Sequence, residues 1–206
     1  VREPESAPGK VPAKLPFSRE GFRRLGGTYW KLVAIGSLLT FARSTEAFLV
    51  LRGSNLGLAN TWVPLVLVTM SLVYTVAAYP AGAWSDKGGR RPLLIAGMVV
   101  LAIADVVLAL ASGMVGLFAG IALWGLHMGL TQGLFAAYIA DLAPGALRGT
   151  AFGVFNLATG VVLLATSALS GFVWDVFSPA TTFWMGAALA MVGAAALFAL
   201  PKGHAT

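Results

Sequence analysis

The sequence predicts an all-α integral membrane protein with six transmembrane helices. Of its 206 residues, 58% are hydrophobic and 11% are charged, whereas soluble domains average about 45–50% apolar and about 25% charged residues. The charged residues are also clustered, because four long stretches carry no charge: 53–85, 106–140, 149–174 and 176–201. Each stretch is long enough for at least one spanning helix, which needs about 20 apolar residues.

The six crossings are placed from the apolar runs and the turns between them, at residues 31–52, 61–84, 92–112, 114–140, 149–174 and 179–200. In lipid, every backbone polar group must be satisfied inside the protein, which leaves only helices and closed barrels. The ten-residue alternation of a transmembrane barrel does not occur in these runs. Helices are therefore expected throughout.

Polar segments flank the expected bundle at residues 29–201. Residues 1–28 are expected to form a cytoplasmic linker, since four prolines and mixed charges argue against a packed core. Its last part, 17–25, is either a basic amphipathic helix on the bilayer surface or a solvated linker. Residues 202–206 are expected to form a short cytoplasmic tail. Because the chain starts at Val1 and not at Met, we expect a piece of a longer protein.

The lysines and arginines predict the orientation. Twelve of the 14 fall on one side of the membrane, in the first 31 residues, around residues 87–91, at Arg148 and at Lys202. Arg52 falls on the other side, and Arg43 lies within the first crossing. Cytoplasmic loops carry the excess of Lys and Arg. Both termini are therefore expected to be cytoplasmic, with the bundle in the cell inner or plasma membrane.

The residue types exclude several classes of function. The chain has no cysteine, so neither a disulfide nor a thiolate metal site is possible. It has no P-loop and no convergent set of acids, bases or nucleophiles, so we expect no enzyme, no cofactor and no metal. The net charge of +6 comes from residues beside membrane segments, and nucleic acid is not an expected partner.

The second cytoplasmic loop carries the most specific motif, Gly82-Ala-Trp-Ser-Asp86-Lys-Gly-Gly-Arg90-Arg91. It resembles the G-x-x-x-D-[RK]-x-G-[RK]-[RK] motif of the major facilitator superfamily of transporters. The glycines permit a tight turn, and Asp86 can accept from backbone N–H groups at a helix N-terminus. The alternative interpretation is an ordinary charged turn that orients two helices.

A second loop, 141–149, reads DLAPGALRG and resembles the P-[ED]-x-x-R-G element of the same superfamily. It departs from that element at Gly145, where the family usually has an acid. The resemblance implies a cytoplasmic charge network that holds the two halves of a transporter in one conformational state. The residues at the matching positions are Asp86, Arg90, Asp141 and Arg148.

The resemblance implies one half of a transporter fold, built as a 3+3 inverted repeat. The charged start, the short tail and the lack of a G-P-x-x-x-G element in the fifth crossing favour the second half, helices seven to twelve. The implied partners are the N-terminal six-helix half, the lipid bilayer and a small solute bound between the halves. The expected function is secondary transport by alternating access, with proton symport or antiport left open. The alternative is a non-transporting receptor or assembly module with this fold.

Charged groups inside the bilayer are functional candidates by default. Arg43 and Glu46 are expected to share a helix face at i, i+3, where they can pair. By the resemblance this helix lines the central cavity, so the pair binds a charged solute group, carries a proton on Glu46, or only fixes packing. Asp105 in the third crossing is expected mainly as an interior structural acid.

One face of the fourth crossing mixes aromatic and polar side chains, as solute cavities often do. Its members share a face through spacings of 3, 4, 4 and 3 residues: Trp124, His127, Thr131, Phe135 and Tyr138. His127 is either a proton carrier, since the ordinary pKa of histidine is about 6.5, or a hydrogen-bonded core residue. Asn156 of the fifth crossing joins the expected pathway. Four further polar residues are left undecided: Gln132, Thr159, Thr166 and Ser170.

The fourth crossing also carries glycines four residues apart, expected to form a close-packing face opposite the aromatic one: Gly116, Gly120, Gly125, Gly129 and Gly133.

The predicted topology is testable because the chain lacks cysteine. Single cysteines in place of Lys87 and Ala146 should react with an impermeant maleimide from the cytoplasmic side, and a cysteine in place of Asn55 from the outside. The parent chain, which should stay unlabelled, is the control. The reverse pattern of labelling would contradict the orientation.

Overall fold

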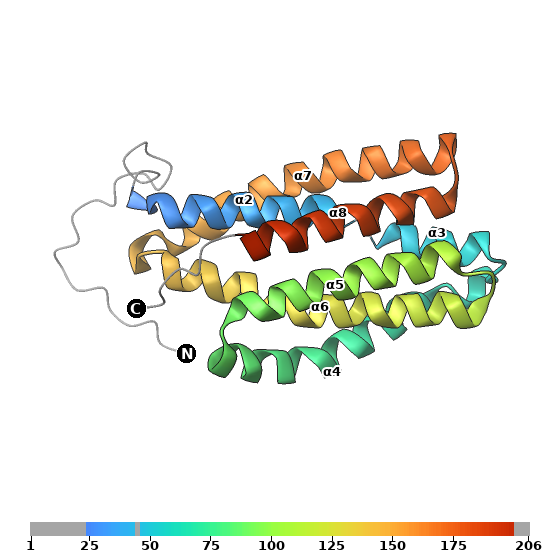
Figure 1. Cartoon of the computed structure of the whole chain (residues 1–206), viewed down its shortest axis with the longest axis horizontal. Helices are drawn as coiled ribbons and strands as arrows, with labels where there is room; N and C mark the ends of the chain where they lie inside the picture. Colours follow the sequence, from blue (N-terminus) through green and yellow to red (C-terminus); the bar gives the residue numbers. More distant parts are fainter. Residues whose placement is uncertain (1–23, 44–45, 200–206) are drawn as a thin grey trace, which may run out of the picture.

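The computed structural model describes residues 24–43 and 46–199, which are helical almost throughout and contain no strand (Figure 1). Six segments are long and apolar enough to cross a membrane, and α2 and α3 together make the first. This confirms the predicted all-α class and the number of crossings. The helices are α2 (Gly26–Ala42), α3 (Ala47–Asn55), α4 (Pro64–Gly88), α5 (Arg90–Leu110), α6 (Met114–Leu142), α7 (Arg148–Val176) and α8 (Pro179–Ala199), with 3-10 turns at Asn60–Trp62 and Gly145–Leu147.

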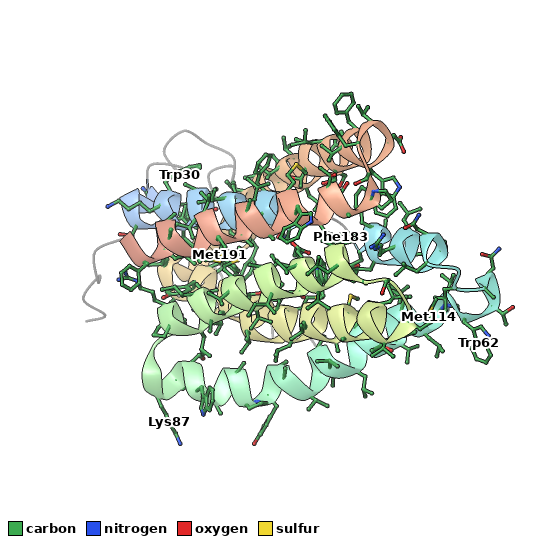
Figure 2. The ribbon with its side chains drawn as sticks, turned by 45° about the vertical axis from the view of Figure 1, so that its right-hand side comes forward. Trp30, Trp62, Lys87, Met114, Phe183 and Met191 are labelled. Atoms are coloured by element: carbon green, nitrogen blue, oxygen red, sulfur yellow. The ribbon has the colours of Figure 1, made fainter. Side chains whose placement is uncertain are left out.

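The long helices run side by side in Figure 1, with α5 packed against both α6 and α8. Helix α4 packs on α6, and α2 packs on α7 and α8. The α4–α5 and α6–α7 connections lie at one end of the bundle, and the α5–α6 and α7–α8 connections lie at the other. Lys87 accordingly lies at the opposite end from Trp62 and Met114 in Figure 2.

The first crossing is not the continuous helix predicted for 31–52. Helix α2 starts earlier than the expected boundary at residue 29, and it ends at Ala42. Arg43 follows with extended backbone (φ −100°, ψ 111°), and α3 begins at Ala47. Most of the predicted linker and the whole predicted tail lie outside the described residues.

Glycines bring α6 close to its neighbours, as predicted from their spacing. A Cβ atom built on Gly125 would lie 2.4 Å from the carbonyl oxygen of Met70 in α4, and one on Gly129 would lie 2.6 Å from Cβ of Ala77. Gly133 differs, because no heavy atom lies within 4 Å of a Cβ built there. The close contact with α4 is therefore confirmed at Gly125 and Gly129, which lie about one turn apart, and it ends before Gly133.

Arg52 ties α3 to the end of α5. This buried side chain donates from Nε to the carbonyl oxygen of Leu108 (3.0 Å) and from Nη2 to those of Ala109 (3.3 Å) and Ala111 (2.9 Å). Its Nη1 donates to Oδ1 of Asn55 (2.8 Å). The last carbonyls of a helix lack intrahelical partners and carry partial negative charge. Arg52 therefore caps α5, a role that the sequence analysis did not foresee.

Arg91 caps α8 in the same way at the opposite end of the bundle. Its Nε donates to the carbonyl oxygen of Leu197 (3.0 Å), and its Nη2 donates to that of Phe198 (2.7 Å). The second arginine of the loop motif thus fastens the start of α5 to the end of α8.

The close approach of α6 to α4 predicts a position-specific cost for added volume. Gly125→Ala places a methyl group against backbone atoms of Met70 and should destabilise the protein by about 1–3 kcal/mol. Gly133→Ala is the matched control, and it should leave stability unchanged or raise it by up to about 1 kcal/mol through helix propensity. Thermal unfolding in detergent measures both variants. Equal melting temperatures for the two would contradict the packing described here.

Candidate solute-binding site

A cavity of about 290 Å³ lies between α2, α6 and α7, with one residue contributed by α5. Its lining is unusually polar for the inside of an apolar bundle, with one arginine, one histidine, three threonines and two amide side chains. The lining residues are Gly36, Leu39, Thr40, Arg43, Met98, His127, Thr131, Gln132, Phe135, Phe155, Asn156 and Thr159.

Arg43 reaches this cavity from the break after α2. Its guanidinium carbon lies 5.7 Å from the ring centroid of Trp124, which is buried, and the ring face attracts the cation. Within residues 24–43 and 46–199, the guanidinium makes no hydrogen bond and no ion pair. Trp124 therefore contacts Arg43 but is not itself among the residues that line the cavity.

Glu46 does not share a helix face with Arg43, so that prediction was wrong. Helix α2 ends before Arg43, whose backbone is extended, and α3 begins after Glu46, so the i, i+3 geometry of one continuous helix is absent. Glu46 is exposed, stands directly before α3, and is not among the residues that line the cavity. Its charge still acts on Arg43 electrostatically.

His127 is held in one orientation by the backbone of α5. Its Nδ1 lies 2.8 Å from the carbonyl oxygen of Gly97. Since a carbonyl only accepts, Nδ1 carries the proton and Nε2 is left as an acceptor in the neutral ring. The hydroxyl of Thr131 donates to the carbonyl oxygen of His127 itself (2.9 Å). Both side chains are buried and both line the cavity.

The structure thus brings four of the seven predicted pathway residues to one cavity, Arg43, His127, Thr131 and Asn156. It adds Gln132 and Thr159, which the sequence had left undecided. Thr40 was missed altogether, although it stands three residues before Arg43 on the same crossing. That spacing is the signal that could have found it.

Tyr138 lies away from the cavity, so its predicted place among the lining residues is corrected. The ring lies beneath Arg90, whose guanidinium carbon is 4.9 Å from the ring centroid. The face of α6 that carries Tyr138 continues beyond the cavity to the end of the bundle where the loop motif lies. Spacing along a helix predicts a shared face but not how far along it a cavity extends.

Arg90 donates from Nη1 to Oδ2 of Asp141 in an ion pair at the end of α6. Two of the four residues of the predicted charge network are therefore in contact. Asp86 and Arg148 are exposed, and neither forms an ion pair with any residue that the structure describes. The role of these four residues as a latch stays a prediction.

Asp105 is a buried acid that faces α8 and not the cavity. Only 5% of its surface is exposed. A Cβ atom built on Gly186 would lie 2.5 Å from its Oδ2, so the carboxyl group occupies space that the missing side chain leaves.

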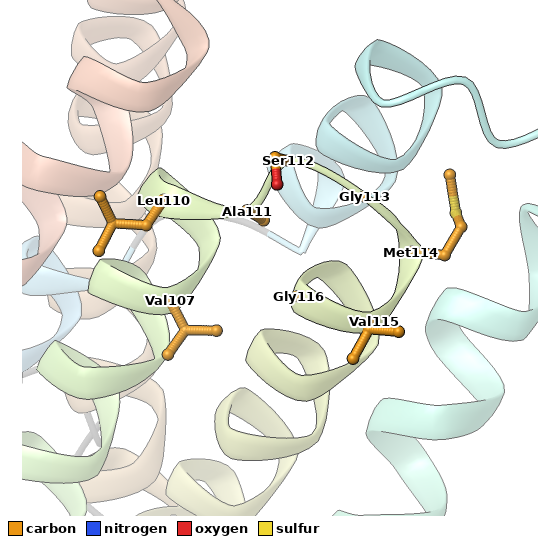
Figure 3. A pocket seen from close by; sticks show the side chains of 8 residues that line it. All are labelled: Val107, Leu110, Ala111, Ser112, Gly113, Met114, Val115 and Gly116. Atoms are coloured by element: carbon orange, nitrogen blue, oxygen red, sulfur yellow. The ribbon is translucent and has the colours of Figure 1, made fainter.

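A larger hollow of about 420 Å³ lies at the turn between α5 and α6 (Figure 3). Its lining runs from Val107 to Gly116, and Ser112 is the one polar side chain among those residues. A solute site needs a few placed polar groups to orient its ligand. The cavity at Arg43 and His127 meets that requirement, and this hollow does not.

Comparison with known proteins agrees with the six apolar helices and the loop motif. The family model of the Major Facilitator Superfamily matches residues 32–205. The chain belongs to the major facilitator superfamily. It is therefore a multi-pass membrane protein of a family of transporters, as the resemblance of the loop motif implied.

Three similar proteins differ in what their names say that they act on. The chain is 28% identical to an uncharacterized transporter of Methanocaldococcus jannaschii, over 87% of this chain and 46% of the relative. It is 28% identical to myo-inositol transporter 2 of Schizosaccharomyces pombe (89% and 35%) and 30% identical to the class B tetracycline resistance protein of Escherichia coli (62% and 31%). The chain spans less than half the length of each. An inositol and an antibiotic are chemically unlike, so membership of the family does not name the solute.

The ion pair between Arg90 and Asp141 should matter more for transport than for stability. An exposed pair contributes about 0.2–1 kcal/mol to folding, so Asp141→Asn should barely change the melting temperature. If the pair exists in only one conformational state, its loss should change the transport rate by about 5-fold or more, as coupling energies of about 1–3 kcal/mol imply.

Asp175→Asn is the matched control for that variant, because Asp175 is also an exposed acid near a helix end but lies at the opposite end of the bundle. It should leave the transport rate unchanged. Equal rates in the Asp141→Asn variant and the parent protein would refute a role for the pair in the transport cycle.

Proposed function

We propose that the chain is the second six-helix half of a secondary active transporter, which moves a small solute by alternating access. The observation that carries the proposal is the cavity at Arg43, His127, Thr131 and Asn156, where polar groups converge inside a bundle whose core is otherwise mainly apolar. Polar and ionisable groups at membrane depth are costly and usually mark the path of a solute.

The partner in this proposal is the N-terminal six-helix half of the same transporter. Helices α4 and α7 are the most exposed crossings, since only 11% of the most apolar window of each is buried within the bundle. Asn156 and Thr159 bring α7 to the cavity. A second bundle that covers α7 closes the site near mid-bilayer, as in transporters built from repeated halves. The membrane is a bacterial inner membrane, with both termini in the cytoplasm.

Conformational control in this proposal comes from the cytoplasmic end of the bundle. The Arg90–Asp141 pair fastens the start of α5 to the end of α6. Asp86 and Arg148 are exposed beside it, where they are available to the other half. A set of ion pairs that exists in one state and breaks in the other is a common bistable element.

Coupling to protons belongs to the same proposal. Two titratable groups support it: Glu46 at the break in the first crossing, and His127 within the cavity. A proton carrier needs access to water in at least one state. Glu46 is exposed, and His127 lines the cavity with Nε2 left as an acceptor.

The transport proposal predicts that Asn156→Ala weakens solute uptake by the complete transporter in proteoliposomes. Loss of one hydrogen-bonding side chain from the cavity should raise KM by about 10-fold, equivalent to about 1.4 kcal/mol. Asn60→Ala, at an exposed 3-10 turn outside the cavity, should leave uptake unchanged.

Uptake that is equal in both asparagine variants would contradict the proposed site. A complete transporter that moves no solute, and that no solute stabilises in a ligand screen, would favour the non-transporting receptor or assembly module.

Proton coupling predicts that a pH gradient drives accumulation of the solute. Glu46→Gln should abolish that accumulation but leave exchange of solute for solute intact, because exchange needs no net proton movement. His127→Asn is the comparison variant. Loss of accumulation in the His127→Asn variant alone would identify His127, and not Glu46, as the proton carrier. If solute accumulation by the parent protein does not depend on the pH gradient, proton coupling is refuted.

A further inference from the structure

The cavity presents one charged group to a solute. Among the residues that the structure describes, Arg43 is the single charged residue that lines the cavity, and it has no hydrogen bond or ion pair to any of them. The guanidinium carbon lies 5.7 Å from the ring centroid of Trp124, and the N–H groups of Arg43 have no hydrogen-bond acceptor among the described residues, so they are available to a ligand. A guanidinium edge matches a carboxylate with two parallel hydrogen bonds.

The threonines of the cavity present acceptors and not donors. The hydroxyl of Thr40 donates to the carbonyl oxygen of Gly36 (2.8 Å), and that of Thr159 donates to the carbonyl oxygen of Phe155 (2.8 Å). Thr131 donates in the same way to the preceding turn of its own helix. A hydroxyl has one proton to give, so each of these oxygens can only accept from a solute.

His127, like the threonines, presents a hydrogen-bond acceptor to the cavity. Its Nδ1 proton is committed to the carbonyl oxygen of Gly97 (2.8 Å), so the neutral ring offers Nε2 as an acceptor. The cavity therefore combines one cationic donor group, four acceptors on three helices, and the amide groups of Gln132 and Asn156, which can both donate and accept. A solute that fits it carries a negative charge at one point and several hydrogen-bond donors elsewhere.

Three simpler solute classes satisfy only part of this lining. An unsubstituted carboxylate pairs with Arg43 but leaves the four acceptors without donors once water is displaced. A neutral polyol supplies donors to the acceptors, but it would cover Arg43 without placing a carboxylate in contact with it. A cation meets a positive charge and no carboxylate among the residues that line the cavity.

We propose that the solute is a small hydroxylated carboxylate. Its carboxylate pairs with Arg43, and its hydroxyl groups donate to Thr40, Thr131, Thr159 and Nε2 of His127. Its carbon chain packs against Phe135 and Phe155, whose ring centroids lie 5.8 Å apart. The inference rests on the proposed function, because it takes this cavity to be the transport site.

The test measures binding of three probes of similar length to the complete transporter. They are D-gluconate, which has both charge and hydroxyl groups, hexanoate, which has only the charge, and myo-inositol, which has only hydroxyl groups. Gluconate should bind at least 10-fold more tightly than either of the others. Hexanoate or myo-inositol binding as tightly as gluconate would overturn the proposal, as would tighter binding of the cation tetraphenylphosphonium.

Variants test the charged group and the hydroxyl acceptors of the cavity separately. Arg43→Gln should weaken gluconate at least 10-fold, and Arg43→Lys should restore part of that loss through its charge. Thr131→Val should weaken gluconate about 10-fold and leave hexanoate unchanged, because hexanoate has no donor for Thr131. Lys31→Gln is the control, since it removes a positive charge from an exposed position on the same helix as Arg43. An Arg43→Gln protein that binds gluconate like the Lys31→Gln protein would refute the anchor.

Failure of this inference is distinguishable from failure of the proposed function. If gluconate does not bind but uptake of another solute still depends on Asn156, the solute class is wrong and the transport site stands. If no solute is moved at all, the proposed function itself fails.

Discussion

The close approach of α6 to α4 and α5 sets the arrangement on which the site depends. Lipid tails are as apolar as the helix surfaces, so burial of apolar area does little to bring transmembrane helices together. Contacts at van der Waals distance must do so, and the glycines of α6 make them possible. Gly125 and Gly129 admit the backbone of α4, and Gly120 admits the side chain of Leu108 from α5. These contacts orient α6 so that His127 and Thr131 meet the cavity.

Most polar groups inside the bundle are paired with helix carbonyls. The threonines bond to the preceding turn of their own helices, and His127 bonds to α5. Arg52 and Arg91 cap the ends of α5 and α8. Such pairing removes the cost of an unsatisfied polar group in a medium without water. Arg43 is the exception among these arginines, because it has only the ring of Trp124. That contrast is the reason for which we propose Arg43 as the anchor of the solute.

The sequence predicted the parts of the molecule that depend on composition and spacing. Apolar runs of spanning length predicted the six crossings, and the spacing from His127 to Thr131 predicted their shared face. The break at Arg43 was not predictable from hydropathy, because the segment remains apolar on both sides of it. The separation of Tyr138 from the cavity depends on where Arg90 lies, and the caps made by Arg52 and Arg91 join residues distant in sequence. These contacts are tertiary, so no local pattern reveals them.

Alternating access to the cavity is the central claim, and it can be tested without knowledge of the solute. Asn156 lines the cavity and is exposed, so a single cysteine there, in a complete transporter otherwise free of cysteine, should react with an impermeant maleimide added to either side of the membrane. Cysteines in place of Lys87 and Asn60 should each react from one side only, and from opposite sides. A cysteine at position 156 that reacts from one side only, or from neither, would contradict the account.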